Sequence, residues 1–382
     1  MTDLWSYLSK TDKPIVLYGT GNGADKILDQ LLLRGITIRG IFASSGFVRN
    51  RTFRGFLVEE YETLHARFPD MIVLVCFGTS RPEVLANIDR IARDHEVYAP
   101  DVPVYGDILF DAAYYDAHAE DLSIVRSILA DDLSRETWDR VIRYKLTGDY
   151  TLLRGCEVPY EAVSGMIRLP DPARYIDLGA YNGDTVSFYT KVFPQIREIV
   201  AVEPDKRNFR KLTETARALF GRENEEEKSS SSIVRSTIAE DGSGQPEEQR
   251  ISSGDKTVFC VRALISDHDG SASIPKNRGR GVHETGDDGN GEKLTAISLV
   301  TLLRDRRTDL IKLDVEGNER AAIEGGREIL LRDRPALVVS CYHRNEDLFL
   351  LPLLIRRIVP DYRVYMRHHP HLLCWDTEFI LV

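Results

Sequence analysis

The sequence is short of cysteine and of basic residues, and each shortage excludes a class of protein. Its five cysteines are scattered and none forms a C-x-x-C pair, which argues against a disulfide framework and a structural zinc site. Acidic residues outnumber basic ones, 60 to 50, for a net charge of −10. We therefore expect no nucleic-acid partner and no anionic membrane partner, since both require clustered Lys and Arg.

Long apolar runs are also missing. The longest, residues 71–77 and 348–355, are too short for a membrane span, so none is expected. The first residues show neither the basic segment nor the apolar segment that a signal peptide has. These patterns predict a cytoplasmic protein.

What the sequence does contain is enough apolar material for two domains, since 42% of its 382 residues are hydrophobic. Strand-like and helix-like segments alternate over residues 1–106, give way to helical patterns over 107–169, and alternate again over 170–382. We predict an α/β protein with a smaller N-terminal Rossmann-like domain, a helical connector and a larger C-terminal domain. A stretch rich in Glu and Ser, about 221–256, is predicted to be a disordered insertion.

The first predicted strand of the C-terminal domain ends in a carboxylate and a glycine-rich turn. Asp177 ends the strand, and Gly179 and Gly183 allow a tight turn into a helix that opens at Asp184. The N–H groups at the start of a helix can bind a carboxylate, whereas Asp177 would repel a pyrophosphate and pair with an ammonium. This pattern favours S-adenosylmethionine over NAD.

The second strand of this domain also ends in an acidic residue. Glu203 lies 24 residues after Gly179, near the spacing at which an acidic side chain accepts the ribose hydroxyls of a nucleoside. One such residue is often structural. Two in register on adjacent strands favour a binding site.

Candidates for catalysis follow two later strands. Asp314 and Glu316 end a strand that also carries Lys312, and His343 follows the next one. The carboxyl ends of these strands are expected to face the same crevice, where any of the three could accept a hydroxyl proton. The alternatives are a Lys312–carboxylate pair that only holds the loop and a structural histidine.

Three further histidines lie close together near the end of the chain. His368, His369 and His371 are expected in a solvated loop with substrate contacts. A metal site would require several of them to converge with a carboxylate, and nothing in the spacing demands this. Carboxylates and histidines permit a metal here without requiring it, so we assign no metal ligand and metal dependence stays open.

Five motifs follow one another in the C-terminal part of the sequence: YIDLGAYNGDT, VAVEPDKRNFRKL, ALISDHDG, DLIKLDVEGNERAAIEGG, and CYHRNED with YRVYMRHHP. In this order they resemble the FkbM family of methyltransferases, over roughly residues 160–382 apart from the insertion. Longer members of that family often have an N-terminal Rossmann-like domain, and YKLTGD in the connector is similar to the segment that precedes their methyltransferase domain.

The resemblance implies a class I methyltransferase domain, Rossmann-like with a seven-stranded mixed sheet. It implies S-adenosyl-L-methionine as cofactor and O-methylation of a small-molecule or glycan acceptor, often a sugar or a natural product. One departure is Val300, where the family usually has an acidic residue. The resemblance and the turn together assign cofactor-binding roles to Asp177, Gly179, Tyr181, Asn182, Gly183, Asp184, Thr185, Glu203, Leu264 and Ser266.

The N-terminal domain has a glycine-rich turn of its own, residues 19–23, between a strand and a helix. No acidic residue follows its second strand, which weakens an NAD site. A nucleotide sugar or another phosphorylated ligand is an alternative, with Arg49, Arg51 or Arg54 as partners, and so is a purely structural role.

Two other functions fit the same sequence. One is a catalytically silent S-adenosylmethionine-type fold that binds a carbohydrate or a protein. The other is an NAD-dependent sugar-modifying enzyme built around the N-terminal domain.

Overall fold

The computed structural model describes the chain except residues 1, 45–47, 49–50, 222–245 and 275–291. Two compact units make up the described part. Unit 1 comprises 1–159 and 366–377, and unit 2 comprises 160–365 and 378–382. Residues 107–159, which are most of the predicted connector, thus belong to unit 1.

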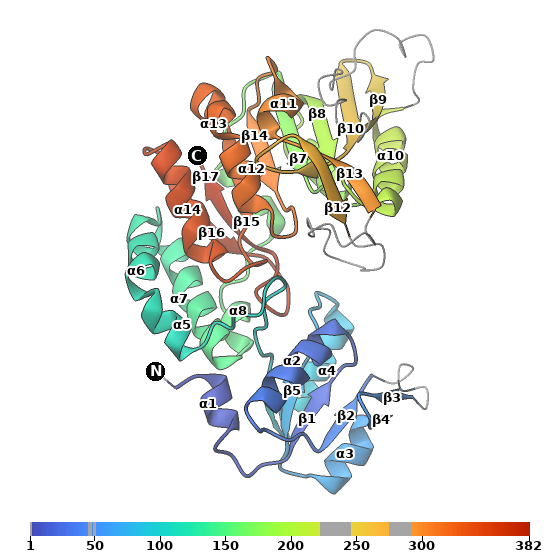
Figure 1. The fold of residues 1–382 in the computed structure, drawn as a ribbon, viewed down its shortest axis with the longest axis vertical. Helices are drawn as coiled ribbons and strands as arrows, with labels where there is room; N and C mark the ends of the chain where they lie inside the picture. Colours follow the sequence, from blue (N-terminus) through green and yellow to red (C-terminus); the bar gives the residue numbers. More distant parts are fainter. Residues whose placement is uncertain (1, 45–47, 49–50, 222–245, 275–291) are drawn as a thin grey trace. The chain divides into compact units, whose positions relative to one another are not determined.

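Unit 1 is built on a six-stranded sheet in the order β3-β4-β2-β1-β5-β6 (Figure 1). All its pairings are parallel except the β3–β4 hairpin. The central strands β1 and β5 are wholly buried, so both faces of this part of the sheet are covered. The strands are β1 (Ile15–Tyr18), β2 (Gly40–Phe42), β3 (Thr52–Phe53), β4 (Phe56–Glu59), β5 (Ile72–Val75) and β6 (Glu96–Tyr98).

Helices complete unit 1. The longest, α7, begins at a cap in which Asp131 accepts the N–H of Ser134, and it ends at Gly148 in the left-handed conformation. A glycine suits this position because it adopts the left-handed conformation without a steric penalty. The helices are α1 (Leu4–Leu8), α2 (Asn22–Leu33), α3 (Tyr61–Arg67), α4 (Pro82–Ile91), α5 (Ala112–Ala117), α6 (Ala119–Ile128), α7 (Asp132–Thr147) and α8 (Thr151–Arg154).

Unit 2 is built on an eight-stranded sheet in the order β16-β17-β15-β14-β7-β8-β10-β9. Seven of these strands were predicted, and the antiparallel β17 makes the sheet mixed, as expected. The strands are β7 (Ala173–Leu178), β8 (Ile196–Val202), β9 (Glu247–Ser253), β10 (Lys256–Arg262), β14 (Leu310–Leu313), β15 (Ala336–Ser340), β16 (Val364–His368) and β17 (Thr377–Leu381), with β16 and β17 crossing the boundary between the units.

The order of strands reverses at β7, which has β8 on one side and β14 on the other. Right-handed crossovers to opposite sides of β7 place the connecting helices on opposite faces, and a ligand crevice is expected at such a reversal. The helices on the β8 side are α9 (Asp184–Val192) and α10 (Lys206–Phe220), and those on the other side are α11 (Leu299–Leu303), α12 (Glu319–Gly325), α13 (Arg327–Asp333) and α14 (Asp347–Ile358) (Figure 1).

The stretch predicted to be a disordered insertion is partly ordered. Strand β9, within it, pairs antiparallel with β10 along its whole length, so the prediction is wrong for residues 247–253. Its isoleucine, Ile251, is fully buried, which gives this polar strand an anchor that composition alone does not reveal. Residues 222–245 of the predicted insertion lie outside the described residues.

A small sheet and a 3-10 helix complete the set of elements. A separate three-stranded sheet joins β11 (Leu264–Ile265), β13 (Glu292–Ile297) and β12 (Gly270–Ile274), and a 3-10 helix spans Tyr160–Gly165.

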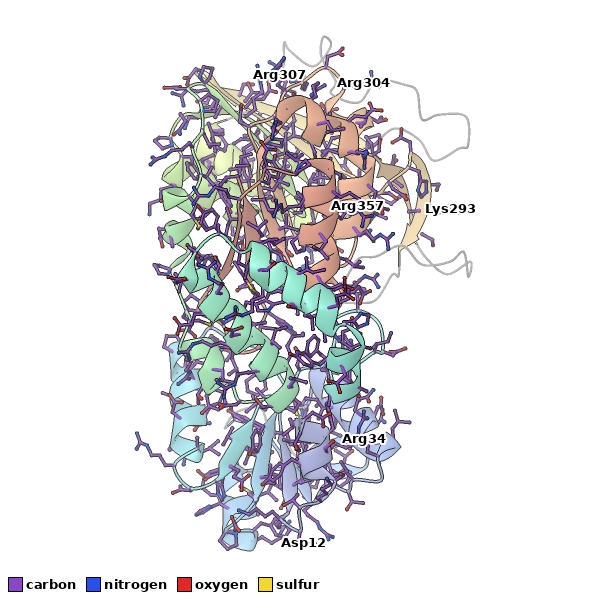
Figure 2. All side chains as sticks on the ribbon, turned by 90° about the vertical axis from the view of Figure 1, so that its left-hand side faces the viewer. Asp12, Arg34, Lys293, Arg304, Arg307 and Arg357 are labelled. Atoms are coloured by element: carbon purple, nitrogen blue, oxygen red, sulfur yellow. The ribbon has the colours of Figure 1, made fainter. Side chains whose placement is uncertain are left out.

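The five cysteines are buried and form no disulfide, as predicted. In the described ranges, no helix combines the length and the apolar character that a membrane crossing demands. Charged side chains such as Arg34, Arg307 and Arg357 project from the surfaces of their units (Figure 2).

Candidate functional site

The turn between β7 and α9 brings backbone and side chains to the carboxyl edge of the sheet. Gly179 has a φ of 84°, and a Cβ there would lie 1.8 Å from the carbonyl oxygen of Asp314, so only glycine fits. Gly183, with a φ of 85°, precedes the first residue of α9. Both glycines predicted from the motif are therefore required by the geometry of the turn.

Asp177, in β7, is completely buried. Its Oδ2 accepts a hydrogen bond of 2.6 Å from the hydroxyl of Thr185, in the first turn of α9. Its Oδ1 has no hydrogen-bond donor among the described residues, and the nearest charge is Nζ of Lys312, 3.6 Å away. A buried carboxylate oxygen without a donor is costly, which makes Oδ1 a strong candidate for a ligand contact.

Glu203, directly after β8, is also buried and faces the same turn. Its carboxylate accepts the N–H groups of Tyr181 and Asp205, both at 2.9 Å. Burial raises the pKa of Glu203 to about 8, although these hydrogen bonds oppose the shift. Tyr181 is 42% exposed and has a φ of 47°, a left-handed conformation that is uncommon outside glycine.

The other predicted residues of the turn hold it together locally. The side chain of Asn182 accepts the N–H of Asp184, whose own carboxylate accepts the N–H of Thr185. The hydroxyl of Thr215, on α10, donates to the carbonyl oxygen of Asn182. These bonds fix the start of α9, and a cofactor role for Asn182 and Asp184 stays a prediction.

Asp314, directly after β14, meets three partners. Nζ of Lys312 lies 3.4 Å from its Oδ2, the hydroxyl of Tyr342 donates to its Oδ1 at 3.1 Å, and Nε2 of His343 lies 3.4 Å from Oδ1. Burial alone would raise the pKa of Asp314, but Lys312 and His343 outweigh it and lower the pKa. Asp314 and the other carboxylates near Lys312 hold the pKa of Lys312 above its usual value, although burial alone would lower it.

His343, after β15, lies among three carboxylates. Its Nε2 is 3.5 Å from Oε2 of Glu316, and its Nδ1 is 2.9 Å from Oε1 of Glu319. Burial lowers the pKa of His343, but Glu319, Asp314 and Glu316 together raise it to about 10. His343 is therefore protonated at neutral pH in the described arrangement, so it is not a ready proton acceptor.

The structure brings the predicted residues of four strands to one edge. From β8 to β15 a continuous row of contacts runs from Glu203 through the turn after β7 to Lys312, Asp314 and His343. The hydrogen bond of 3.0 Å from Lys312 to the carbonyl oxygen of Gly179 joins the cofactor candidates to the catalytic candidates. This edge is the candidate site.

Sequence reasoning missed Glu319, the first residue of α12, which is completely buried in the site. It lies three residues after Glu316 and opens the helix that follows β14, and an acidic residue at a helix start was the available signal. Asp347 was also missed. It is 2% exposed, and burial together with Glu319 raises its pKa well above the usual value.

Leu264 and Ser266, two of the residues predicted to bind the cofactor, have local partners. Leu264 packs in a small apolar core with Ala272, Leu294 and Ala296. The N–H of Ser266 donates to the carbonyl oxygen of Ile297. Cofactor binding by Leu264 and Ser266 therefore stays a prediction.

Val300 stands where the family usually has an acidic residue, but a residue near Val300 supplies a carboxylate. Asp269 accepts the N–H of Ser298 at 2.8 Å and the hydroxyl of Thr301 at 2.5 Å. The start of α11 is thus capped by an acidic side chain from another segment.

Outside this edge, one expectation changes and another stays open. His368 and His369 are completely buried and bond to Thr377 and to the carbonyl oxygen of Val158, so a solvated loop is wrong for them. In the glycine-rich turn of unit 1, a Cβ at Gly23 would lie 2.3 Å from the carbonyl oxygen of Cys76. That glycine is needed for packing, and phosphate binding by this turn stays a prediction.

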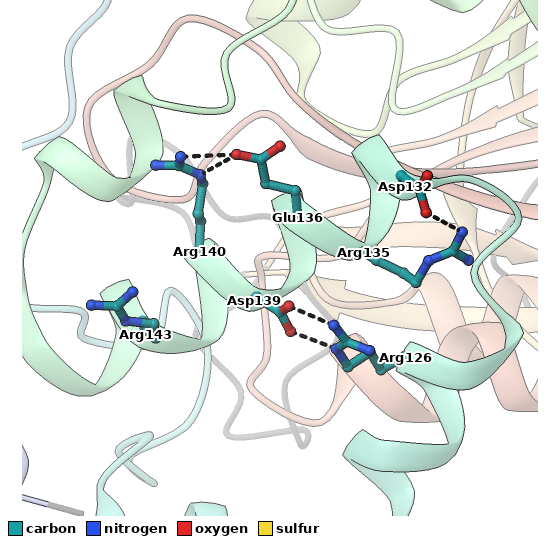
Figure 3. Close-up of a pocket in the computed structure, with 7 residues that line it drawn as sticks. All are labelled: Arg126, Asp132, Arg135, Glu136, Asp139, Arg140 and Arg143. Carbon is teal, nitrogen blue, oxygen red and sulfur yellow. Dashed lines mark hydrogen bonds and ion pairs between the residues drawn. The ribbon is translucent and has the colours of Figure 1, made fainter.

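A hollow elsewhere, on α6 and α7 of unit 1, is lined only by charged side chains (Figure 3). Asp139 pairs with Arg126, Asp132 with Arg135, and Glu136 with Arg140. Matched surface ion pairs of this kind are typical of a solvated helix face and contribute little to stability. The residues that line this hollow lie in another part of the sequence, and none of them is a candidate site residue.

Comparisons with known proteins agree with this geometry. The model of the methyltransferase FkbM domain matches residues 177–369, more than half of the chain. A crystal structure of methyltransferase FkbM from Methylobacillus flagellatus KT is similar over 97% of this chain and 90% of that chain, with a TM-score of 0.67 and 19% identity, which confirms the fold. No curated protein matches the sequence. The chain belongs to the FkbM methyltransferase family.

Proposed function

We propose that this methyltransferase moves a methyl group from S-adenosylmethionine to a hydroxyl of a sugar, glycan or natural-product acceptor. The observation that carries the proposal is the fully buried Asp177, whose Oδ1 lacks a donor at the edge of the sheet. The ammonium group of a methionine would give this oxygen a charge-assisted hydrogen bond.

The rest of the turn fits the cofactor as well. Gly179 keeps the chain close to β14 and leaves no side chain over the edge. Each carboxylate oxygen of Glu203 accepts one backbone N–H, which leaves further acceptor capacity for the two hydroxyls of a ribose. The residues present therefore suit a nucleoside that carries an amino acid.

S-adenosylmethionine supplies, when bound, a methyl group on a positively charged sulfur. The protein's main task is then to hold the acceptor oxygen in line with that methyl group. Positioning can contribute about 7–11 kcal/mol. A general base adds roughly 10²–10⁴-fold in rate, so it is the smaller contribution.

Among the three catalytic candidates, Glu316 suits the role of base best. His343 already carries a proton at neutral pH, and the lowered pKa of Asp314 makes it a weak acceptor. The Glu316 side chain is 36% exposed, so a substrate can reach it. Its φ of 55° is a strained conformation of the kind that clusters at functional sites.

The acidic character of this edge also favours a hydroxylated acceptor. The carboxylates of Asp314 and Glu316 are hydrogen-bond acceptors, and they are partly exposed. Sugar hydroxyls are donors that such groups can orient. An apolar acceptor would offer these carboxylates no hydrogen bond.

The test combines cofactor binding with transfer to a panel of hydroxylated acceptors. Calorimetry should show binding of S-adenosylmethionine, with no binding of NAD. Release of S-adenosylhomocysteine, with mass spectrometry of the product, should locate the methyl group on oxygen. Glu316→Gln should lower kcat/KM by about 10²–10⁴-fold with cofactor affinity unchanged, whereas Glu161→Gln, at an exposed site, should change neither.

Four results would contradict the proposal. Failure to bind S-adenosylmethionine would remove its basis, and methylation on nitrogen or sulfur would correct the acceptor class. Tight cofactor binding with no turnover on any acceptor would favour a silent carbohydrate- or protein-binding module. Binding of NAD in place of S-adenosylmethionine would favour the NAD-dependent alternative.

A further inference from the structure

Three side chains in unit 2 converge in the way that metal ligands do. Asp314 follows β14, Glu319 opens α12, and His343 follows β15. One ligand atom of each lies within 4.8 Å of the other two. Neighbouring ligands of a metal ion with bonds of about 2.0–2.2 Å are spaced closely, so only a small closure would bring these three groups onto one ion.

Glu319 gives the second, independent observation. Its side chain is completely buried, and Oε1 accepts the N–H of Val315 at 2.9 Å. Oε2 has no hydrogen-bond partner among the described residues. A buried carboxylate oxygen in this situation costs free energy, which a bound cation would offset.

The charge around this point is negative. Three carboxylates, those of Asp314, Glu316 and Glu319, lie within 3.5 Å of the imidazole of His343. Lys312 adds a positive charge, but it is shared with Asp177. Even with both basic groups charged, the cluster that includes Asp177 has more negative than positive groups.

We propose that Asp314, Glu319 and His343 bind a divalent metal ion, with Glu316 at the rim of the site. His343 loses its proton to solvent when the ion binds, because a coordinating imidazole must be neutral. Two carboxylates and one imidazole are ligands that first-row divalent ions accept. Three protein ligands leave coordination positions open to water or to an oxygen of the acceptor. The sequence assigns no metal ligand, so this proposal goes beyond the sequence-based expectation.

The ion's role, but not its binding, rests on the proposed function. A divalent ion at this edge would hold and polarise the acceptor hydroxyl, while Glu316 takes the proton as the oxygen bonds to the methyl carbon. The bond between that carbon and sulfur breaks, and the electron pair stays on sulfur. The transfer therefore balances without an additional reactant.

Binding of Mn²⁺ to the full-length protein, followed by electron paramagnetic resonance after chelator treatment, tests the site without any turnover. The wild-type protein should bind one Mn²⁺ per chain, and Mg²⁺ should compete. Glu319→Gln and His343→Gln should each weaken binding by roughly 100-fold or more, whereas Glu316→Gln should have a smaller effect. Glu136→Gln, in the charged hollow of Figure 3, is the matched control and should bind as the wild type does.

A buried substitution can also unfold the protein, so thermal melting and S-adenosylmethionine binding accompany every variant. Asp314→Asn is the additional variant, because the Asp314 side chain is 30% exposed and tolerates change better than Glu319. Loss of Mn²⁺ binding in a folded Asp314→Asn protein supports the proposal. Unchanged Mn²⁺ binding in that protein or in folded Glu319→Gln overturns it.

The two proposals fail separately. Wild-type protein that binds S-adenosylmethionine but no Mn²⁺ overturns the metal site and leaves the proposed function intact. In that case the cluster is an ion-paired network around a protonated His343. Protein that binds Mn²⁺ at this site but no S-adenosylmethionine keeps the metal site and removes the proposed function.

Discussion

Lys312 and Asp177 occupy paired positions on adjacent parallel strands, and Nζ of Lys312 lies 3.6 Å from Oδ1 of Asp177. The lysine donates its hydrogen bond elsewhere, to the carbonyl oxygen of Gly179 at 3.0 Å. Asp177 thus receives a compensating charge without a hydrogen bond on Oδ1. The geometry stabilises a buried carboxylate and still leaves one oxygen for a ligand.

Removing the charge of Asp177 should weaken cofactor binding. A hydrogen bond to a charged group is worth about 1.5–3 kcal/mol, so Asp177→Asn should lower the affinity for S-adenosylmethionine by roughly 10–150-fold. Calorimetry gives the dissociation constant. Asp171→Asn, at an exposed site in the same unit, is the control and should keep wild-type affinity. Wild-type affinity in Asp177→Asn would show that the ammonium binds elsewhere.

Gly179→Ala should destabilise unit 2. The new Cβ would lie 1.8 Å from the carbonyl oxygen of Asp314, and the φ of 84° disfavours any L side chain. We expect a loss of about 2 kcal/mol or more in the free energy of unfolding, measured by urea denaturation. Gly165→Ala is the matched control, since a Cβ there meets no atom within 4 Å. Equal stability of the two variants would contradict this account of the turn.

The site could be predicted where an apolar, strand-like run of the sequence ends directly in a functional side chain. Asp177, Glu203 and Asp314 each follow or end an apolar run, and strand order alone sends such residues to one edge. Glu319 could not be found this way, because its position depends on how sharply the chain turns at Gly317, which has a φ of 95°.

The burial of polar segments was the other feature that could not be predicted from the sequence. The polar sequence of β9 predicts disorder, yet its pairing with β10 and the burial of Ile251 order it. The cluster of histidines predicts a solvated loop, yet His368 and His369 find buried acceptors in unit 1. Both errors arise because long-range partners, which a single sequence does not display, decide whether a polar side chain is buried.

Cofactor binding should depend on the ionisation of Glu203. Burial raises the pKa of this carboxyl to about 8, so it is largely protonated at pH 6.5. Ribose hydroxyls donate to the ionised form, so affinity should rise with pH up to about 8 and then level off, by at most about tenfold per pH unit. Calorimetry between pH 6 and 9 measures this slope. Glu203→Gln should bind weakly at every pH, and any slope that persists in it belongs to the ligand or to another residue.

The protonated His343 should make stability fall at alkaline pH. Its pKa is raised from 6.5 to about 10 in the folded protein, since Glu319, Asp314 and Glu316 surround it. A folded-state pKa above the unfolded value means that the native state binds the proton more tightly. The resulting stability is fully present below pH 6.5 and is lost as the pH rises through about 10.

Urea denaturation from pH 6 to 10.5, with a chelator present to keep metal ions away, checks this behaviour. The free energy of unfolding of the wild type should decline across that range, whereas His343→Gln should start lower and decline less, because it has no proton to lose there. His268→Gln alters an exposed histidine and should follow the wild-type curve. If His343→Gln declined as steeply as the wild type, the imidazole would not be charged among its carboxylates, and Glu319 would have to be balanced by something other than this proton.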